Sequence, residues 1–262
     1  MRARWAYVLA ATILMGVVLL AGCSSTGSTA TTATTVATTV TTAAGHADLQ
    51  EDLFSPAQEV LNAVNPSVVN ISVSATVQGQ SASGVGSGVV YTADGLILTN
   101  DHVVTLDSNV NSGQKIQVTF STGEQVPATI VGENAGKDVA AIKVVKTGLT
   151  PVTFGASANV QLAQWAIVIG SPLDFRNTIS LGIISGLDRT LDIGSGQSLT
   201  GLIQVDAAIS PGNSGGGCFD SQGHFIGMPE VYLPPGQTGA ENIGFCIPAD
   251  VVASVAKTLT GR

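Results

Sequence analysis

Three short segments of the chain carry residue types that together can perform acyl transfer. His102 lies in the run 99–104, Asp138 in the run 137–140 and Ser214 in the glycine-rich run 212–216. A serine hydroxyl is a poor nucleophile until a neighbouring imidazole accepts its proton. The imidazole in turn needs a carboxylate that fixes its tautomer and stabilises its charged form. The three segments therefore predict a nucleophilic serine with a general base and an orienting carboxylate.

The order of these residues along the chain separates unrelated folds that share this chemistry. Histidine before aspartate before serine is the order of chymotrypsin-like double barrels, whereas subtilisins and α/β-hydrolases use other orders. Each residue also has a simpler interpretation: an isolated histidine, a turn aspartate and a loop serine. The other two histidines, His46 and His224, are interpreted as ordinary satisfied or exposed side chains.

Further runs match one family of serine proteases, in the order that the family shows. They cover residues 66–71, 86–90, 169–173, 181–186, 204–209 and 243–248. From about Ser55 to its end the chain therefore resembles the protease domain of the HtrA (Deg) family of trypsin-like serine proteases. The resemblance implies a catalytic triad of His102, Asp138 and Ser214. It also implies an oxyanion hole formed by the backbone N–H groups of Gly212 and Ser214.

The spacing of apolar segments predicts an all-β fold. The chain has 31 glycines and only 5% aromatic residues, as expected for short strands joined by tight turns. The predicted strands are 68–73, 88–92, 96–99, 116–120, 126–131, 139–145, 165–169, 179–184, 202–205, 225–228 and 244–247. With the resemblance, they predict a chymotrypsin-like double six-stranded antiparallel β-barrel with short N- and C-terminal helices. Ser55 is the expected N-cap of the first helix and Asp250 that of the last, which runs to Thr260.

The resemblance also gives expectations about specificity and activation. It places the floor of the primary specificity pocket at Ala208 and Ile209, where the lack of an acidic residue favours small or medium aliphatic side chains. Asn213 precedes the serine where digestive trypsin relatives carry an aspartate, so activation by a newly cut N-terminus is not expected. Residues 187–198 are the candidate for a loop whose ordering sets the activity.

Two of the three cysteines depart from the family pattern. Cys218 and Cys246 stand where most relatives carry other residues, and they are the remaining thiols if Cys23 is modified. In an oxidising compartment such a pair can form a bond. We therefore expect a disulfide between Cys218 and Cys246, with two buried free thiols as the alternative.

The N-terminus predicts export and anchoring. Arg2 and Arg4 precede an apolar stretch, and the run 20–23 resembles the lipobox of bacterial lipoproteins. We expect a lipoprotein signal peptide over 1–22 and a lipid on Cys23; the alternatives are an uncleaved membrane anchor and a plain secretory signal. A Ser/Thr/Ala-rich tether over 23–50 would then lead to the first barrel (51–148) and to the second barrel with the C-terminal helix (149–262).

These expectations combine into a functional hypothesis. The chain is predicted to be a lipid-anchored extracytoplasmic serine endopeptidase of a bacterial cell envelope that cleaves unfolded or damaged proteins for quality control. A proteolytically latent or silent chaperone or binding module on the same fold is the alternative. The net charge of −8 disfavours nucleic acid. No metal, other cofactor or PDZ domain is expected, and the resemblance suggests a homotrimer.

Overall fold

The computed structural model describes residues 57–77, 80–106, 114–170, 178–194, 197–232 and 242–262. All of them belong to one compact unit, Ala44–Arg262; the other unit, Met1–Ala43, lies outside the described residues. The expected signal peptide, tether, lipidated Cys23 and Ser55 cap also lie outside them. In the described ranges, no helix is long and apolar enough to cross a membrane.

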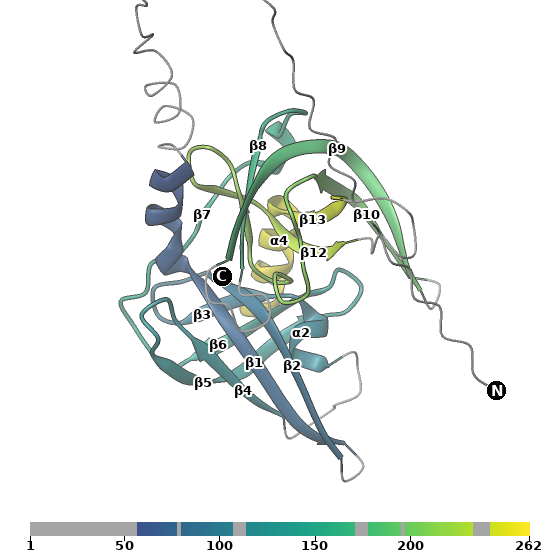
Figure 1. Cartoon of the computed structure of the whole chain (residues 1–262). Helices are drawn as coiled ribbons and strands as arrows, with labels where there is room; N and C mark the ends of the chain where they lie inside the picture. The colour runs from purple at the N-terminus through teal and green to yellow at the C-terminus, as the bar shows by residue number, and fades with distance from the viewer. Residues whose placement is uncertain (1–56, 78–79, 107–113, 171–177, 195–196, 233–241) are drawn as a thin grey trace, which may run out of the picture. The chain divides into compact units, whose positions relative to one another are not determined.

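The first six strands close into a barrel in the order β1-β2-β3-β6-β5-β4 (Figure 1). They are β1 (Val68–Val77), β2 (Gln80–Val90), β3 (Leu96–Thr99), β4 (Lys115–Thr119), β5 (Gln125–Asn134) and β6 (Val139–Val144). All of their pairings are antiparallel, and β1 closes the ring by pairing with both β2 and β4. The first predicted barrel is therefore present.

A second barrel follows in the chain. Its strands are β8 (Trp165–Gly170), β9 (Thr178–Gly194), β10 (Gln197–Val205), β11 (Gly217–Phe219), β12 (His224–Tyr232) and β13 (Gly244–Pro248). They pair in the order β11-β8-β9-β10-β13-β12, and a further β11–β12 pairing completes the ring. The short strand β7 (Thr153–Phe154) adds to β12 in parallel, the one departure from antiparallel pairing among the described strands. The double six-stranded barrel is thus confirmed.

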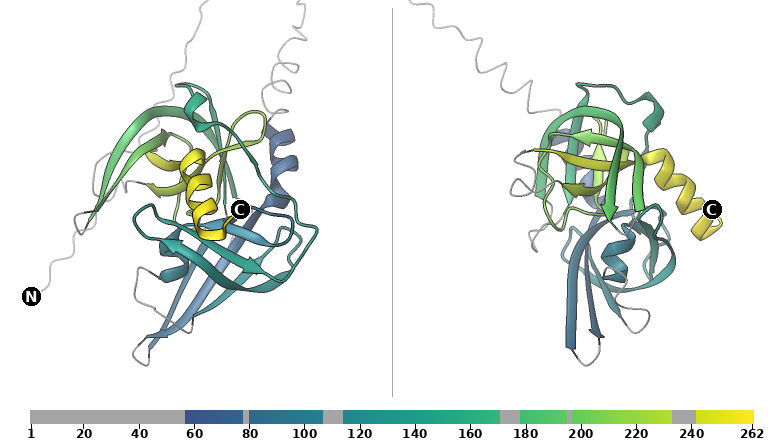
Figure 2. Two further views of the ribbon diagram at one scale, coloured as in Figure 1. Left: turned by 180° about the vertical axis from the view of Figure 1, so that it is seen from behind. Right: turned by 90° about the vertical axis from the view of Figure 1, so that its right-hand side faces the viewer.

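Helical segments flank the barrels, as predicted. Residues 57–64 are helical and lead into the 3-10 turn η1 (Asn65–Ser67). At the other end, α4 (Ala249–Thr260) packs against β5 and β6 of the first barrel and against β12 and β13 of the second. Figure 2 shows α4 along the side where the barrels meet. Gly261, with φ +69°, ends the helix.

The expected N-cap of this last helix is wrong by two residues, because Pro248 holds the cap position. The missing side-chain cap comes from η2 (Ser157–Asn159), where Ser157 Oγ accepts a hydrogen bond from the Asp250 N–H at 3.1 Å. The Asp250 carboxylate in return accepts hydrogen bonds from Ser157 Oγ and the Ala158 N–H. Each element thus caps the other, which no local sequence pattern shows.

Three hydrophobic clusters hold the unit together. One fills the first barrel and includes Ile71, Ile97 and Ile142. Another fills the second barrel. The third contains residues of both barrels and of α4, among them Leu98 and Phe225. Because this shared core is apolar and buried, it holds the two barrels in a fixed arrangement.

Two strand predictions need correction. Strand β2 begins at Gln80, eight residues before its predicted start, because its glycines serve close packing rather than a turn. A Cβ on Gly86 would lie 2.6 Å from Val103, and one on Gly88 would lie 2.8 Å from Ile97. The expected loop over 187–198 instead consists, in its described part, of the end of β9 and the start of β10, which pair with each other.

Candidate active site

The first barrel brings His102 and Asp138 together. Strand β3 ends at Thr99, which pairs with Ala140 near the start of β6. The short helix α2 (Asp101–Thr105) follows β3, and Asp138 directly precedes β6, so the two side chains leave neighbouring strands at the same edge. These residues lie 36 positions apart in the sequence, and the pairing of β3 with β6 brings them into contact.

The Asp138 carboxylate contacts His102 at two points. One oxygen accepts the His102 backbone N–H at 3.0 Å, and the other lies 2.9 Å from His102 Nδ1. Asp138 is 6% exposed and has φ +50°, a conformation that the Asn100 side chain supports by donating to the Asp138 carbonyl at 2.8 Å. An ionised carboxylate only accepts, so the proton of a neutral His102 ring lies on Nδ1 and Nε2 is the acceptor nitrogen.

The loop that carries Ser214 belongs to the second barrel but is bound by the first. Ser87 of β2 donates its backbone N–H to the Ser214 carbonyl at 2.9 Å. Its hydroxyl donates to the Gly212 carbonyl at 2.7 Å, and this contact is buried. Strand β2 therefore holds the serine loop at two positions, beside the barrel edge that carries His102.

The glycines around Ser214 are required by the close approach of the two barrels. Gly215 has φ +83°, and a Cβ at this position would overlap Thr99 Oγ1 and the Ser87 carbonyl. A Cβ on Gly216 would overlap the Ile169 carbonyl. Only residues without a side chain let this loop lie against β2 and β3.

Glu230 of β12 also belongs to the site and was missed by the sequence analysis. Its carbonyl accepts a hydrogen bond from the Ser214 hydroxyl at 2.9 Å. A carboxylate oxygen of Glu230, one of Asp138 and a ring nitrogen of His102 all lie within 4.8 Å of one another. Glu230 stands in an apolar strand after Pro229, and a lone acidic residue in such a segment was the available signal.

Two carboxyl groups of the site have raised pKa values. Burial, and then the negative charge of Asp138, raise the pKa of Glu230 to about 7, while the charge of His102 opposes the shift. Burial, together with the charges of Asp138 and Glu133, raises the pKa of Asp101 to about 6. The site is therefore crowded with acidic groups whose ionised forms disfavour one another.

The remaining predicted site residues are placed as follows. Within the described residues, the N–H groups of Gly212 and Ser214 donate to no acceptor. Ala208 is exposed, and its carbonyl accepts from Ser180 Oγ at 2.7 Å. Ile209 is buried in the apolar cluster of the second barrel, so its side chain contributes to that core. His224 is satisfied by Asp220, as its simpler interpretation predicts.

The expected disulfide is not formed in the structure. Cys218 of β11 and Cys246 of β13 are both free thiols and fully buried. A hydrogen bond with Cys218, followed by burial, raises the pKa of the Cys246 thiol well above its usual value. A buried, protonated thiol pair can take the place of a disulfide here, because both side chains already pack in the apolar interior of the second barrel.

These buried thiols lead to a prediction. In the native protein without reductant, neither Cys218 nor Cys246 should react with iodoacetamide, because both are buried and the Cys246 thiol stays protonated. Both should react once the protein is denatured, still without reductant, and peptide mapping would locate the modified residues. If reaction required prior reduction, the two thiols would be bonded to each other, which would contradict this prediction.

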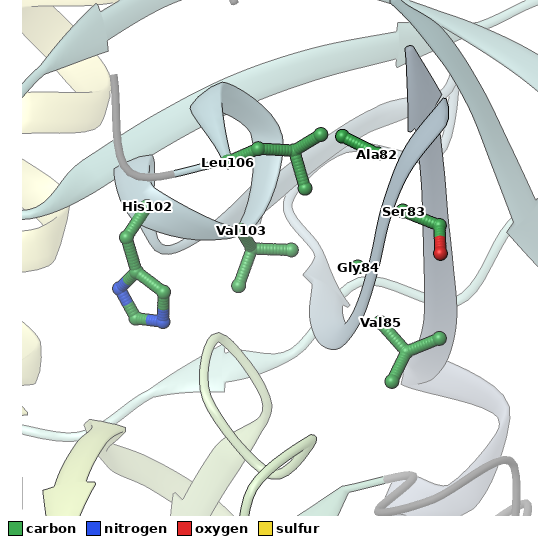
Figure 3. A pocket seen from close by; sticks show the side chains of 7 residues that line it. All are labelled: Ala82, Ser83, Gly84, Val85, His102, Val103 and Leu106. Carbon is green, nitrogen blue, oxygen red and sulfur yellow. The ribbon is translucent and has the colours of Figure 1, made fainter. Parts of the chain in front are cut away.

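A pocket lies beside His102, between α2 and β2 (Figure 3). Its volume is about 320 Å³, and it is lined by Ala82, Ser83, Gly84, Val85, His102, Val103 and Leu106. A Cβ on Gly84 would lie 2.7 Å from Leu106, so glycine at this position keeps α2 close to the strand. Polar and apolar atoms contribute almost equally to its lining.

The side chains of His102, Asp138 and Glu230 could also supply ligands to a divalent cation. Such an ion would compete with the 2.9 Å contact between His102 and Asp138, which already satisfies both groups. We therefore assign no metal role to them.

Comparisons with known proteins agree with this geometry. The family model described as trypsin-like peptidase domain matches residues 86–228. Serine protease PepD of Mycobacterium tuberculosis is 35% identical over 78% of this chain and 47% of that protein. The chloroplastic Protease Do-like 1 of Arabidopsis thaliana is 37% identical over 67% of this chain and 39% of that protein. A serine protease HtrA-like protein of Staphylococcus haemolyticus is 34% identical over 67% of this chain and 28% of that protein.

A solved structure of the HtrA-type protease AlgWS227A with a tripeptide aligns with a TM-score of 0.66 and 29% identity. The alignment covers 78% of this chain and 64% of that one. This chain spans at most about half the length of the curated relatives described above. The family model covers more than half of the chain and includes the segments of all three residues first singled out in the sequence. The chain therefore belongs to the trypsin-like peptidase domain family, with HtrA/Deg serine proteases among its relatives.

Proposed function

We propose that the protein is a serine endopeptidase that works through His102, Asp138 and Ser214. The observation that carries this proposal is the double contact of the buried Asp138 carboxylate with the backbone N–H and Nδ1 of His102. His224 makes the same two contacts with Asp220 without a nucleophile nearby. His102 differs because it lies in one cluster with Glu230, whose carbonyl accepts the Ser214 hydroxyl, and a general base needs a fixed tautomer and ring orientation beside such a hydroxyl. Membership of the trypsin-like peptidase family supports the same assignment.

The reaction begins when Ser214 Oγ attacks the carbonyl carbon of the scissile peptide. The Ser214 proton moves to His102 Nε2, a new C–O bond forms, and the negative charge develops on the carbonyl oxygen. Among the described residues the N–H groups of Gly212 and Ser214 have no acceptor, and they are suited to bind that oxygen. His102 then returns the proton to the leaving nitrogen, the C–N bond breaks, and an acyl-enzyme remains.

Water completes the cycle by the same route. The water oxygen attacks the acyl carbon while His102 takes a proton from the water. His102 then gives this proton to Ser214 Oγ as the ester bond breaks. Asp138 accepts from Nδ1 throughout and stabilises the imidazolium formed in each half of the reaction. No other group is needed to balance the protons.

We further propose that the pocket beside His102 binds a side chain of the substrate. Ala82→Trp would fill part of its volume of about 320 Å³. This substitution should therefore raise KM for peptide substrates several-fold, with little change in the reactivity of Ser214 toward a small fluorophosphonate probe. Ser81→Trp is the matched control, because Ser81 precedes Ala82 and points to the other face of β2. Equal KM values for wild type and Ala82→Trp would show that peptides bind elsewhere.

One contact favours the second candidate function, a proteolytically latent or silent module. A hydroxyl has one hydrogen, and in this structure Ser214 donates it to the Glu230 carbonyl rather than to His102. Attack on a substrate requires the Ser214 side chain to rotate toward Nε2. The arrangement is thus a resting one, and a protein that never left it would bind substrates without cleaving them.

The setting of the activity is also part of the proposal. A DegP-like serine endoprotease of Ectopseudomonas mendocina, 34% identical over 69% of this chain, is described as periplasmic. This supports an extracytoplasmic location, and the N-terminal sequence supports a lipid on Cys23 that holds the protein at a bacterial membrane. We propose unfolded or damaged proteins as substrates, cut next to small or medium aliphatic residues. Ala208 and Ile209 would lie near the subsite for those residues. The proposed assembly is a homotrimer.

The test of this function uses one protein substrate in two states. The purified protein is incubated with ribonuclease A in its native form and after reduction and carboxymethylation, and new N-termini are identified by mass spectrometry. We expect cleavage of the unfolded form only, and none by the Ser214→Ala variant. Binding of the unfolded form without new termini would favour the latent module, and cleavage by both variants would overturn the proposal.

A further inference from the structure

Glu230 is the residue that connects all three groups of the proposed triad. Its backbone carbonyl accepts the Ser214 hydroxyl at 2.9 Å. Its side chain lies with the Asp138 carboxylate and the His102 ring inside one cluster, in which the three ligand-type atoms are within 4.8 Å of each other. The residue is 9% exposed, so these contacts are made with little access of water.

The side chain of Glu230 is not satisfied as an anion. In the described part of the chain, its Oε2 atom has no hydrogen-bond partner. A buried carboxylate without donors is costly, and a second carboxylate next to it increases the cost. As a neutral carboxylic acid the same group has an O–H to donate, and the Asp138 carboxylate, which can accept, lies in the same cluster.

The titratable groups around Glu230 come from three elements. Asp138, before β6, and His102 of α2 lie with it in one cluster, and Asp101 precedes His102 in α2. The Cys246 thiol of β13 is near enough for the charge of Glu230 to act on it, and it is uncharged because its pKa is raised. A hydrogen bond with the Asp138 side chain adds to the effects of burial and charge that raise the pKa of Glu230.

We propose that Glu230 is a positioning residue that acts as a neutral carboxylic acid, donates a hydrogen bond to Asp138 and makes the activity depend on its own protonation. This inference rests on the proposed function, because it concerns how the His102–Asp138 pair is held during catalysis. Glu230 does not exchange a proton with the substrate. It holds the Asp138 carboxylate, which in turn holds the ring of His102, the general base.

Loss of the Glu230 proton has a defined consequence. Two carboxylates then face His102, and their combined negative charge favours the imidazolium form of the ring. Because rising pH only removes protons, the ring still becomes neutral, at a higher pH. The rate then falls because Asp138 has lost one of its donors and holds the His102 ring less firmly. The coupled groups titrate as a unit, so the rate should rise with pH as His102 becomes neutral and fall again as Glu230 ionises.

The proposal is tested by the pH dependence of Ser214 reactivity in the full chain. The second-order rate of labelling by a fluorophosphonate probe is measured from pH 5 to 9, with EDTA present to exclude divalent cations. Glu230→Gln keeps the shape of the side chain and retains N–H donors but cannot ionise. We expect a rise and fall for the wild type and a single rise to a plateau for Glu230→Gln. At pH 8.5 the variant should label at least about tenfold faster, since a group with a pKa near 7 is almost fully ionised there.

Two further variants separate positioning from space filling. Glu230→Leu has similar bulk without a donor, and we expect slower labelling than Glu230→Gln at every pH. Glu133→Gln removes an exposed negative charge that acts on Asp101 without entering the cluster, and it should keep the wild-type profile.

The outcomes separate the role of Glu230 from the assignment of the protein as a protease. If wild type and Glu230→Gln share one profile, or if Glu230→Leu matches Glu230→Gln, the role of Glu230 is overturned while the protease assignment stands. If neither protein labels at any pH, the proposed function itself has failed.

Discussion

Asp138→Asn is expected to lower kcat by about 10⁴-fold while leaving the protein folded. In the structure both oxygens of Asp138 accept from His102, one from the backbone N–H and one from Nδ1. An asparagine can keep one acceptor, but its NH₂ group would meet one of the two donors. The ring would then turn or change tautomer, so that Nε2 carries the proton and no longer accepts that of Ser214. The measurement is kcat for an internally quenched peptide.

The chain supplies a matched control in a second aspartate–histidine pair. Asp220 accepts the His224 backbone N–H at 2.9 Å, and its other oxygen lies 3.1 Å from His224 Nδ1. Asp220→Asn disturbs the same set of contacts in the turn between β11 and β12, and we expect it to leave kcat unchanged. Similar losses in both variants would mean that general destabilisation, rather than the tautomer of His102, explains the effect.

Gly215→Ala is expected to reduce the rate of fluorophosphonate labelling of Ser214 by about 10²-fold or more, the effect of losing one oxyanion donor. The added Cβ would overlap Thr99 Oγ1 and the Ser87 carbonyl, so the loop has to move away from β2. That movement displaces the Ser214 N–H and hydroxyl from the positions that β2 gives them. The backbone would also be strained, because φ at this position is +83°.

Gly201→Ala provides the comparison for Gly215→Ala. Gly201 has φ +72° and no atom within 4 Å of the position of a Cβ, so the substitution adds backbone strain without overlap. It should lower thermal stability by about 1 kcal/mol and leave labelling at the wild-type rate. If both variants labelled normally, the serine loop would not need its contact with the first barrel.

Much of the fold could be predicted because apolar strands and their order are local properties of the sequence. Strand β3 was predicted with its observed bounds, and Leu96–Thr99 is buried throughout, as an uninterrupted apolar run indicates. Strand β2 was missed in its first half because Gly84 and Gly86 look like turn residues. Their function is to admit Leu106 and Val103 of the facing segment, a contact between distant residues that no local pattern encodes.

The site, like the fold, could be predicted only in part from the sequence. The motifs around His102, Asp138 and Ser214 were sufficient to propose a triad, and the structure brings the first two into contact. Glu230 was missed because its role depends on the side chains that face β12 across the barrels, not on its neighbours in sequence. A disulfide between Cys218 and Cys246 was predicted, whereas the structure has two free thiols, because whether such a pair is bonded depends on geometry that spacing does not determine.

The central claim is that Ser214 is an activated nucleophile, and labelling of the purified protein by a fluorophosphonate probe tests it most directly. Wild type and Ser214→Ala are treated in parallel near pH 7, and the modified peptide is identified by mass spectrometry. We expect one modified residue, Ser214, in the wild type and no labelling of the variant. Labelling that persists in Ser214→Ala, or its absence from the wild type over the whole range from pH 5 to 9, would contradict the claim.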